Sequence, residues 1–346
     1  MKNQFLFNIF FSLLLFSCNK NHDINSTIQS NVYVAGYESN GNNYVAKYWK
    51  NGTAINLTNG ASSFASSITV SGNDVYVAGD EFSGSHYIAK YWKNGAPIAV
   101  SDGTKDALTS SIAVSANNVY VAGFESTNGI SDKVAKFWQN SSLIQLTDGL
   151  TEARATCLTT AGGNIYIGGW QKNIGSDIHI AMFWINGLPI SIDDGGNNIV
   201  TSITVSGNNI YLGGFELSRT NGVHQVAKYW KNTNPVILTD GSNTAGVSSI
   251  FISGKDIYAA GWESNGNHFV AKYWKNGVPV ILSDGSKNAS ANSIAVSSNN
   301  DVYVAGTEAN NVLGSLAVAK YWKNGSAVDL TDGTKDAAAT SIFIDR

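Results

Sequence analysis

One unit of about 45 residues recurs seven times between Asn31 and the end of the chain, and this repetition restricts the fold more than any other feature. Each unit has a Tyr-x-x-Gly signature, then an aromatic residue followed by Trp, then a turn that closes on Gly. The signature tyrosines from Tyr33 to Tyr303 are 43, 44, 46, 45, 47 and 45 residues apart. Such a period is typical of solenoids, propellers and other repeat architectures.

Each unit also predicts four short β-strands. In the segment 111–146, four runs alternate apolar and polar residues with period two and are bounded by Gly, Asn, Asp and Ser. In five units an Asn-Gly pair such as Asn94-Gly95 joins the third run to the fourth, which is a strong hairpin signal. Four strands in each of seven units are the pattern of propeller blades.

The two ends of the repeat array complement each other. The first unit starts at its second strand, near Asn31, and the last stops after a first strand, Ser341–Ile344. We therefore predict an all-β fold: one seven-bladed β-propeller over residues 31–346, with four-stranded antiparallel blades, closed by the C-terminal strand joining the first blade. Closure would remove the exposed strand edges of an open array. An open β-solenoid is the competing prediction.

The N-terminus predicts export and lipidation. Lys2 precedes an apolar run of about 12 residues, shorter than the roughly 20 that span a bilayer. We read residues 1–17 as a lipoprotein signal peptide. Leu15-Phe16-Ser17-Cys18 resembles the lipobox of bacterial lipoproteins, which implies that Cys18 carries lipid and that 18–30 is a polar tether. The alternative is an ordinary signal peptide with an incidental cysteine.

The repeats also resemble known families. Asn31-Val32-Tyr33-Val34-Ala35-Gly36, followed by Val45 to Trp49, is similar to SBBP-type bacterial propeller repeats, and Ile165 to Gly169 is similar to kelch. This resemblance implies a propeller and carries no single activity.

Composition narrows the function. Only 14% of residues are charged and the net charge is −3, which argues against nucleic-acid binding. The 43% hydrophobic content excludes disorder, and two cysteines exclude a disulfide framework or a structural zinc site. No cofactor is predicted.

Six units carry a Glu two residues after the signature Gly and a Lys just before the aromatic-Trp pair. Strand alternation places both on one face of adjacent strands, so we predict structural ion pairs. A glutamate ring that binds cations is the alternative. The pairs are Glu38 with Lys47, Glu81 with Lys90, Glu125 with Lys136, Glu216 with Lys228, Glu263 with Lys272 and Glu308 with Lys320. The fourth unit has Gln171 and Met182 instead.

Insertions collect in the loops between second and third strands, and loops on a rigid scaffold commonly carry binding. In five units an aromatic residue directly follows the signature Gly, where the strand runs toward these loops. These residues are candidates for ligand binding, with blade packing as the alternative: Tyr37, Phe124, Trp170, Phe215 and Trp262.

Metal binding and catalysis find little support. His86, His179, His224 and His268 precede third strands of four different blades, and only two Asp-Gly turns offer a second nearby carboxylate. No metal site and no catalytic residue are predicted, since no Ser-His-Asp order, zinc motif or phosphate loop stands out.

The sequence therefore predicts a lipid-anchored binding or interaction module of the bacterial cell envelope, with the membrane face undetermined. The anchor would hold it at a membrane, its partner would be a protein or glycan, and the domain would be monomeric. We expect it not to be an enzyme. The alternatives are an enzyme acting on an extracellular polysaccharide, with the irregular fourth unit as the place to look, and a structural component of an envelope complex.

Overall fold

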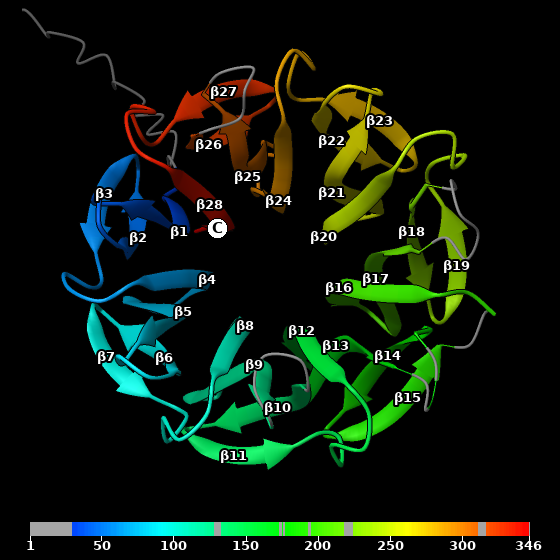
Figure 1. The fold of residues 1–346 in the computed structure, drawn as a ribbon. Coiled ribbons are helices and arrows are strands. Elements are labelled where there is room, and N and C mark those ends of the chain that lie inside the picture. Colours follow the sequence, from blue (N-terminus) through cyan, green and yellow to red (C-terminus); the bar gives the residue numbers. More distant parts are fainter. Residues whose placement is uncertain are drawn as a thin grey trace, which may run out of the picture.

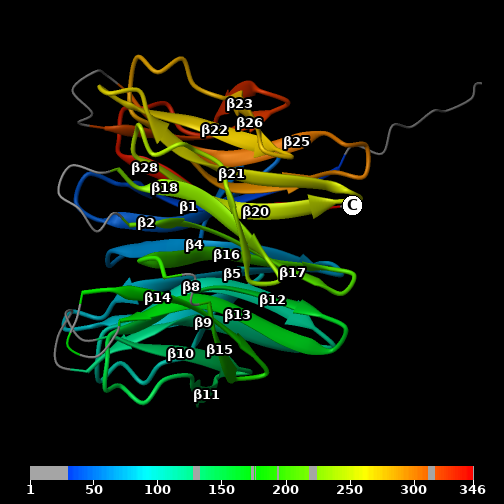
Figure 2. The same cartoon turned by 90° about the vertical axis from the view of Figure 1, so that its right-hand side faces the viewer.

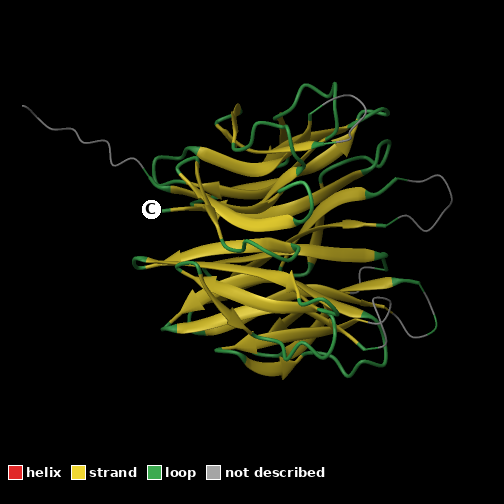
Figure 3. Ribbon diagram, turned by 60° about the vertical axis from the view of Figure 1, so that its left-hand side comes forward, coloured by secondary structure: helices red, strands yellow, loops and turns green. Residues whose placement is uncertain are grey.

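The computed structural model describes residues 30–127, 133–172, 175, 177–192, 195–217, 224–310 and 316–345. These residues form seven four-stranded antiparallel sheets arranged as blades around a central axis (Figure 1). Strands and loops account for all the described residues, as Figure 3 shows. The fold is a seven-bladed β-propeller, as the repeat count and strand patterns predicted.

We name the blades A to G in chain order. Blade A consists of β28 (Ala337–Ile344), β1 (Val32–Ser39), β2 (Tyr44–Lys50) and β3 (Thr53–Asn56); blade B of β4 (Ser63–Ser71), β5 (Asp74–Phe82), β6 (Tyr87–Lys93) and β7 (Ala96–Ala99); blade C of β8 (Ala107–Ser115), β9 (Asn118–Ser126), β10 (Lys133–Gln139) and β11 (Ser142–Gln145). Blade D consists of β12 (Ala153–Ala161), β13 (Asn164–Lys172), β14 (His179–Ile185) and β15 (Leu188–Ile192); blade E of β16 (Asn198–Ser206), β17 (Asn209–Glu216), β18 (Val226–Lys231) and β19 (Asn234–Ile237). Blade F consists of β20 (Ala245–Ser253), β21 (Asp256–Ser264), β22 (Phe269–Lys275) and β23 (Val278–Ile281); blade G of β24 (Ala289–Val296), β25 (Val302–Ala309), β26 (Ala317–Lys323) and β27 (Ser326–Asp329).

The last strand closes the ring. β28 lies in blade A and pairs antiparallel with β1, with Val34 opposite Ile342. The strand order β28-β1-β2-β3 confirms the predicted closure and excludes an open solenoid. In Figure 1 the first strand of each blade, including β28, faces the centre, and the fourth strands form the rim.

The signature glycine is required by a close backbone approach. In every blade the first strand contains a β-bulge beside this glycine, for example between Ala65 and Ser67 opposite Gly79. A Cβ atom on Gly79 would lie 2.2 Å from the Phe64 carbonyl oxygen and 2.7 Å from the Trp92 ring. A Cβ atom on the equivalent glycine of each of the other six blades would lie 1.9–2.1 Å from a carbonyl oxygen. Only glycine fits there.

Adjacent blades pack through a buried tryptophan and through serine hydroxyls. The indoles of Trp49, Trp92, Trp138, Trp184, Trp230, Trp274 and Trp322 are all almost fully buried. At five junctions between blades, the hydroxyl of a serine just after the bulge accepts a hydrogen bond from the backbone N–H of an isoleucine in the next blade. These bonds join Ile68 to Ser341, Ile112 to Ser67, Ile250 to Ser202, Ile294 to Ser249 and Ile342 to Ser293. Cys157 occupies the serine position in blade D.

The predicted signal peptide, Cys18 and the tether up to Gln29 lie outside the described residues. In the part of the chain that is described, no helix is long and apolar enough to cross a membrane.

Candidate functional site

The two ends of the propeller carry different loops between strands, and Figure 2 shows the propeller from the side with both ends in view. The loops between second and third strands lie at the same end as the connections from each blade to the next, because the four strands of a blade are sequential and antiparallel. We call this end the loop face. In blade F the loop and the connection touch there, since Asn265 Nδ2 donates to the Gly285 carbonyl at 2.9 Å.

The structure brings together each of the six Glu and Lys residues that were paired from the sequence. Three Nζ to Oε2 distances are 2.5–2.6 Å and that of Lys136 to Glu125 is 3.3 Å. Lys47 with Glu38 and Lys320 with Glu308 are also ion pairs. Four of the ammonium groups also lie 5.5–5.9 Å from the ring centre of the tryptophan two residues later. Each glutamate is therefore neutralised within its own blade.

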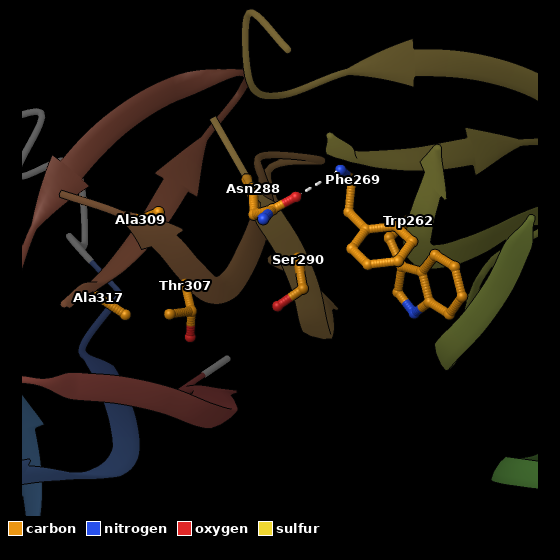
Figure 4. A pocket seen from close by; sticks show the side chains of 8 residues that line it. Trp262, Phe269, Asn288, Ser290, Thr307, Ala309 and Ala317 are labelled. Carbon is orange, nitrogen blue, oxygen red and sulfur yellow. Dashed lines mark hydrogen bonds between the residues drawn. The ribbon is translucent and has the colours of Figure 1, made fainter. Parts of the chain in front are cut away.

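A pocket of about 380 Å³ opens on the loop face between blades F and G (Figure 4). Blade F provides two aromatic rings, Trp262 near the end of β21 and Phe269 at the start of β22. Their ring centres are 4.8 Å apart in an edge-to-face arrangement. Blade G and the connection leading into it provide small side chains: Asn288, Ala289, Ser290, Thr307, Ala309 and Ala317.

The pocket exists because blade G lacks the bulky side chains that other blades place at the same four positions. In blade G, Ser290 of β24 lies opposite Thr307 of β25. Ala309 and Ala317 lie opposite each other at the two ends of the loop between β25 and β26. In blade B the equivalent residues are Phe64, Asp80, Phe82 and Tyr87, and in blade F they are Gly246, Trp262, Ser264 and Phe269. Every blade except G has a large side chain in at least one of the four.

The polar side chains that line the pocket are neutral. The Phe269 N–H donates to Asn288 Oδ1 at 2.9 Å, so the amide oxygen of Asn288 has a partner and its amide nitrogen is a separate donor. In the described part of the chain neither this nitrogen, nor the Ser290 hydroxyl, nor the Trp262 indole N–H makes a hydrogen bond. The Thr307 hydroxyl is buried and has no partner among the described residues. The pocket therefore offers aromatic surface together with unused hydrogen-bonding groups.

The five aromatic residues proposed from the sequence lie in different environments. Phe124 and Trp170 are buried, whereas Tyr37, Phe215 and Trp262 are partly exposed. Of the five, Trp262 alone lines the pocket described above. Tyr37 packs edge-on against Tyr44 and Phe64.

Phe124 and Trp170 hold an arginine between them. The Arg154 guanidinium lies 5.0 Å from the Phe124 ring centre and 5.2 Å from that of Trp170. Arg154 Nη2 also lies 3.4 Å from Glu152 Oε1, and Lys172 Nζ lies 3.3 Å from Glu152 Oε2. These two rings are therefore occupied by cation–π packing inside the protein.

Asp80 is an unexpected buried carboxyl group. It follows the signature glycine of blade B, where five other blades have an aromatic ring, and it is only 5% exposed. Asp80 Oδ1 accepts a hydrogen bond from the Thr109 N–H at 3.4 Å. Burial raises the pKa of the Asp80 carboxyl to about 7.

Two of the histidines and Asp336 hydrogen-bond with neighbouring groups of the protein. His179 Nδ1 lies 3.1 Å from Asn197 Oδ1, and His224 Nδ1 lies 2.8 Å from Thr244 Oγ1. Asp336 accepts the Ala317 N–H and the Tyr44 hydroxyl. Over the described ranges, no three His, Cys, Asp or Glu side chains are grouped so as to hold a metal ion.

Sequence reasoning had proposed Trp262 but missed Phe269 and the small residues opposite. The seven units did contain a signal. Thr307 is the one neutral, non-aromatic residue that follows a signature glycine, and Ala317 stands where Phe269, Tyr44 and Tyr87 stand in other units. The signal for the pocket lies in several positions of two adjacent units taken together.

No protein-family model matches the chain, and no curated protein matches it in sequence. Solved structures match its fold. The β-propeller domain of the trilobed protease from Pyrococcus furiosus is 13% identical with a TM-score of 0.54, over 87% of this chain and 95% of that one. That domain is described as having an open velcro topology, whereas here β28 pairs with β1.

Two longer chains are also similar. Acylaminoacyl peptidase from Pyrococcus horikoshii and an acylaminoacyl peptidase in complex with Z-Gly-Gly-Phe-chloromethyl ketone are each 12% identical, with TM-scores of 0.52. The matches cover 87% and 86% of this chain and 53% of each peptidase. This chain therefore spans about half the length of those peptidases, and at this identity the likeness establishes the fold.

The prediction that this chain is not an enzyme was wrong. It relied on the lack of a recognisable catalytic motif in the repeats, yet chains that contain this fold include peptidases. A propeller without such a motif is therefore no ground for excluding enzymatic activity. The described residues do not identify a catalytic site.

Proposed function

We propose that this chain is a lipid-anchored propeller of the bacterial cell envelope that binds a ligand through its loop face. The pocket between blades F and G carries the binding part of the proposal. Ligand sites are concave, largely apolar and supplied with a few convergent polar groups, and this pocket has all three properties.

The position of the pocket within the repeat array supports the same conclusion. A propeller of near-identical blades offers seven equivalent junctions, and packing alone favours filling them all. At this junction four positions are small together, while Phe269 remains 43% exposed on the opposite wall. An unfilled, partly aromatic hollow costs packing energy, so we attribute its presence to binding.

The anchor part of the proposal rests on the sequence. Cys18 follows a short apolar run and a lipobox-like segment, and the repeats resemble SBBP-type and kelch propellers. The full chain should incorporate labelled palmitate, and the Cys18→Ala variant should not. The variant protein should also be absent from the membrane fraction. Label that persists in Cys18→Ala would refute lipidation at this residue.

The binding part can be tested by thermal unfolding of the full chain in the presence of two probe panels, methyl glycosides of neutral hexoses and capped single amino acids. A probe that raises the midpoint for the native chain should lose its effect in Ala317→Phe, which fills the pocket. His179→Phe is the matched control, because it places the same ring at the equivalent position of blade D. If no probe of either panel shifts the midpoint, ligand binding at this pocket is refuted.

A second candidate is a propeller that acts together with a peptidase. The similarity to two acylaminoacyl peptidases and to a protease propeller domain favours it. A fluorophosphonate probe applied to complexes purified with the full chain would label a serine peptidase if one is associated. Purified complexes without labelled protein would count against this candidate.

A further inference from the structure

We infer that the pocket between blades F and G binds a neutral sugar ring. This inference rests on the proposed binding function of the loop face and names the class of ligand. It is argued from the charge of the pocket, the chemistry of its two walls and its size.

The lack of charge in the pocket limits which ligands can bind there. None of the eight residues that line the pocket is ionisable. Asp336, which contacts the lining residue Ala317, accepts hydrogen bonds from the Ala317 N–H and the Tyr44 hydroxyl, so both of its carboxylate oxygens have partners. A charged ligand would lose its hydration without gaining an opposite charge, which is costly. The ligand is therefore expected to be uncharged.

The two walls require a ligand with both apolar and polar faces. Trp262 and Phe269 form an aromatic wall, and the negative face of such rings attracts the polarised C–H groups on one side of a pyranose. The other wall offers the Ser290 hydroxyl and the Asn288 amide nitrogen. Figure 4 shows Ser290 and Thr307 on neighbouring strands, with the two rings beyond Ser290. A sugar ring presents C–H groups and hydroxyls at once, so it can engage both walls.

The unpaired polar groups separate a sugar from an apolar peptide side chain. A leucine or phenylalanine side chain would cover the aromatic wall but leave the Ser290 hydroxyl and the Trp262 indole N–H desolvated without partners. Each buried, unpaired group of this kind lowers the affinity for the ligand that leaves it unpaired. The Thr307 hydroxyl is buried without a partner among the described residues, and Thr307 lines the pocket. Sugar hydroxyls can donate to and accept from all of these groups.

The volume agrees with a small saccharide. About 380 Å³ lies at the lower end of the range typical of small-molecule sites, roughly 300–1,000 Å³. A single hexose with part of a neighbouring residue fits this space, and the opening on the loop face allows a longer glycan to continue outward.

Saturation-transfer NMR on the full chain tests this inference with methyl glycosides of neutral hexoses as sugar probes and N-acetylphenylalanine amide as the peptide probe. At least one glycoside should receive saturation, with the strongest transfer to the ring protons that face Trp262. Its affinity should fall at least tenfold in Ala317→Phe and in Trp262→Ala, and stay within twofold of the native value in His179→Phe. Circular dichroism should confirm that each variant is folded.

The outcomes separate this inference from the proposed function. If only N-acetylphenylalanine amide binds, and Ala317→Phe abolishes its binding, the pocket is a binding site but the sugar inference is wrong. If a glycoside binds equally well to Ala317→Phe, sugar binding occurs elsewhere and the inference is also wrong. If neither probe binds, both the inference and the proposed binding function fail.

Discussion

A Cβ atom added to Gly213 of blade E would lie 2.8 Å from Cγ1 of Val247 in blade F. The same relationship joins Gly168 to Val200 one junction earlier, at 2.9 Å. Four other junctions have alanine at both positions: Ala35 with Ala65, Ala122 with Ala155, Ala260 with Ala291 and Ala305 with Ala339. The missing methyl group on one blade thus offsets the larger side chain on the next, because blade interfaces are close-packed.

Gly213→Ala is expected to destabilise the propeller by about 1–3 kcal/mol, as overpacking of a core does. Val247→Ala in the same chain should recover part of the loss, because the double variant reproduces the alanine pair of the other junctions. Urea unfolding of the two single variants and the double variant measures the coupling. Strictly additive effects would show that the two positions do not share this space.

The hairpin between β18 and β19 contains a strained threonine. Thr233 has φ of 72°, in the left-handed region, where five of the other units have glycine. A β-branched side chain is disfavoured there, so Thr233→Gly should raise the free energy of unfolding by roughly 1 kcal/mol. Chemical denaturation measures this gain. The reverse change at the equivalent position, Gly277→Thr, should destabilise by a similar amount; if it does not, the strain argument fails.

The ion pair between Lys272 and Glu263 can be tested against the natural exception in blade D. Removing one partner of a largely buried pair leaves a charge uncompensated, so Glu263→Gln should cost about 2 kcal/mol of stability. Adding Lys272→Met reproduces Gln171 and Met182 and should cost less than Glu263→Gln alone. Calorimetric midpoints of the three chains decide the order. A double variant less stable than Glu263→Gln would contradict the prediction.

Asp80 should make stability depend on pH. Burial raises its pKa in the folded chain to about 7, from 3.8. Between these values the folded chain keeps a proton that the unfolded chain has released, so stability falls as the pH rises from about 4 to about 7 and then levels off. Each unit of pKa difference corresponds to about 1.4 kcal/mol.

Replacement with asparagine keeps the shape of Asp80 and removes its titration. Asp80→Asn should therefore be more stable than the native chain at pH 8, with the difference shrinking toward pH 4. Urea midpoints of both chains across this range provide the measurement. A constant difference between the two chains would show that Asp80 does not titrate in this window.

Much of the fold could be predicted from the sequence because its signals are local and repeated. Period-two runs define the strands, and Asn-Gly pairs such as Asn94-Gly95 define the hairpins, since both residues there have positive φ. The Glu and Lys residues lie on neighbouring strands of one blade, so alternation alone places them together. The complementary ends of the array predicted that β28 would join β1.

The site could be predicted only in part. Trp262 belonged to a class of five aromatic residues whose members have the same place in the repeat but different surroundings. Arg154 occupies the space between Phe124 and Trp170, whereas a pocket lies beside Trp262. Neither environment can be predicted from the sequence of a single repeat unit.

The sequence by itself determined the number of blades, their strands and the closure of the ring, because these depend on patterns within 45 residues and on the ends of the array. Only the tertiary structure decided that the junction between blades F and G holds a pocket lined by Trp262 and Phe269. That depends on side chains of two blades meeting across an interface, where Phe269 remains exposed because Ala317 and Thr307 are too small to cover it.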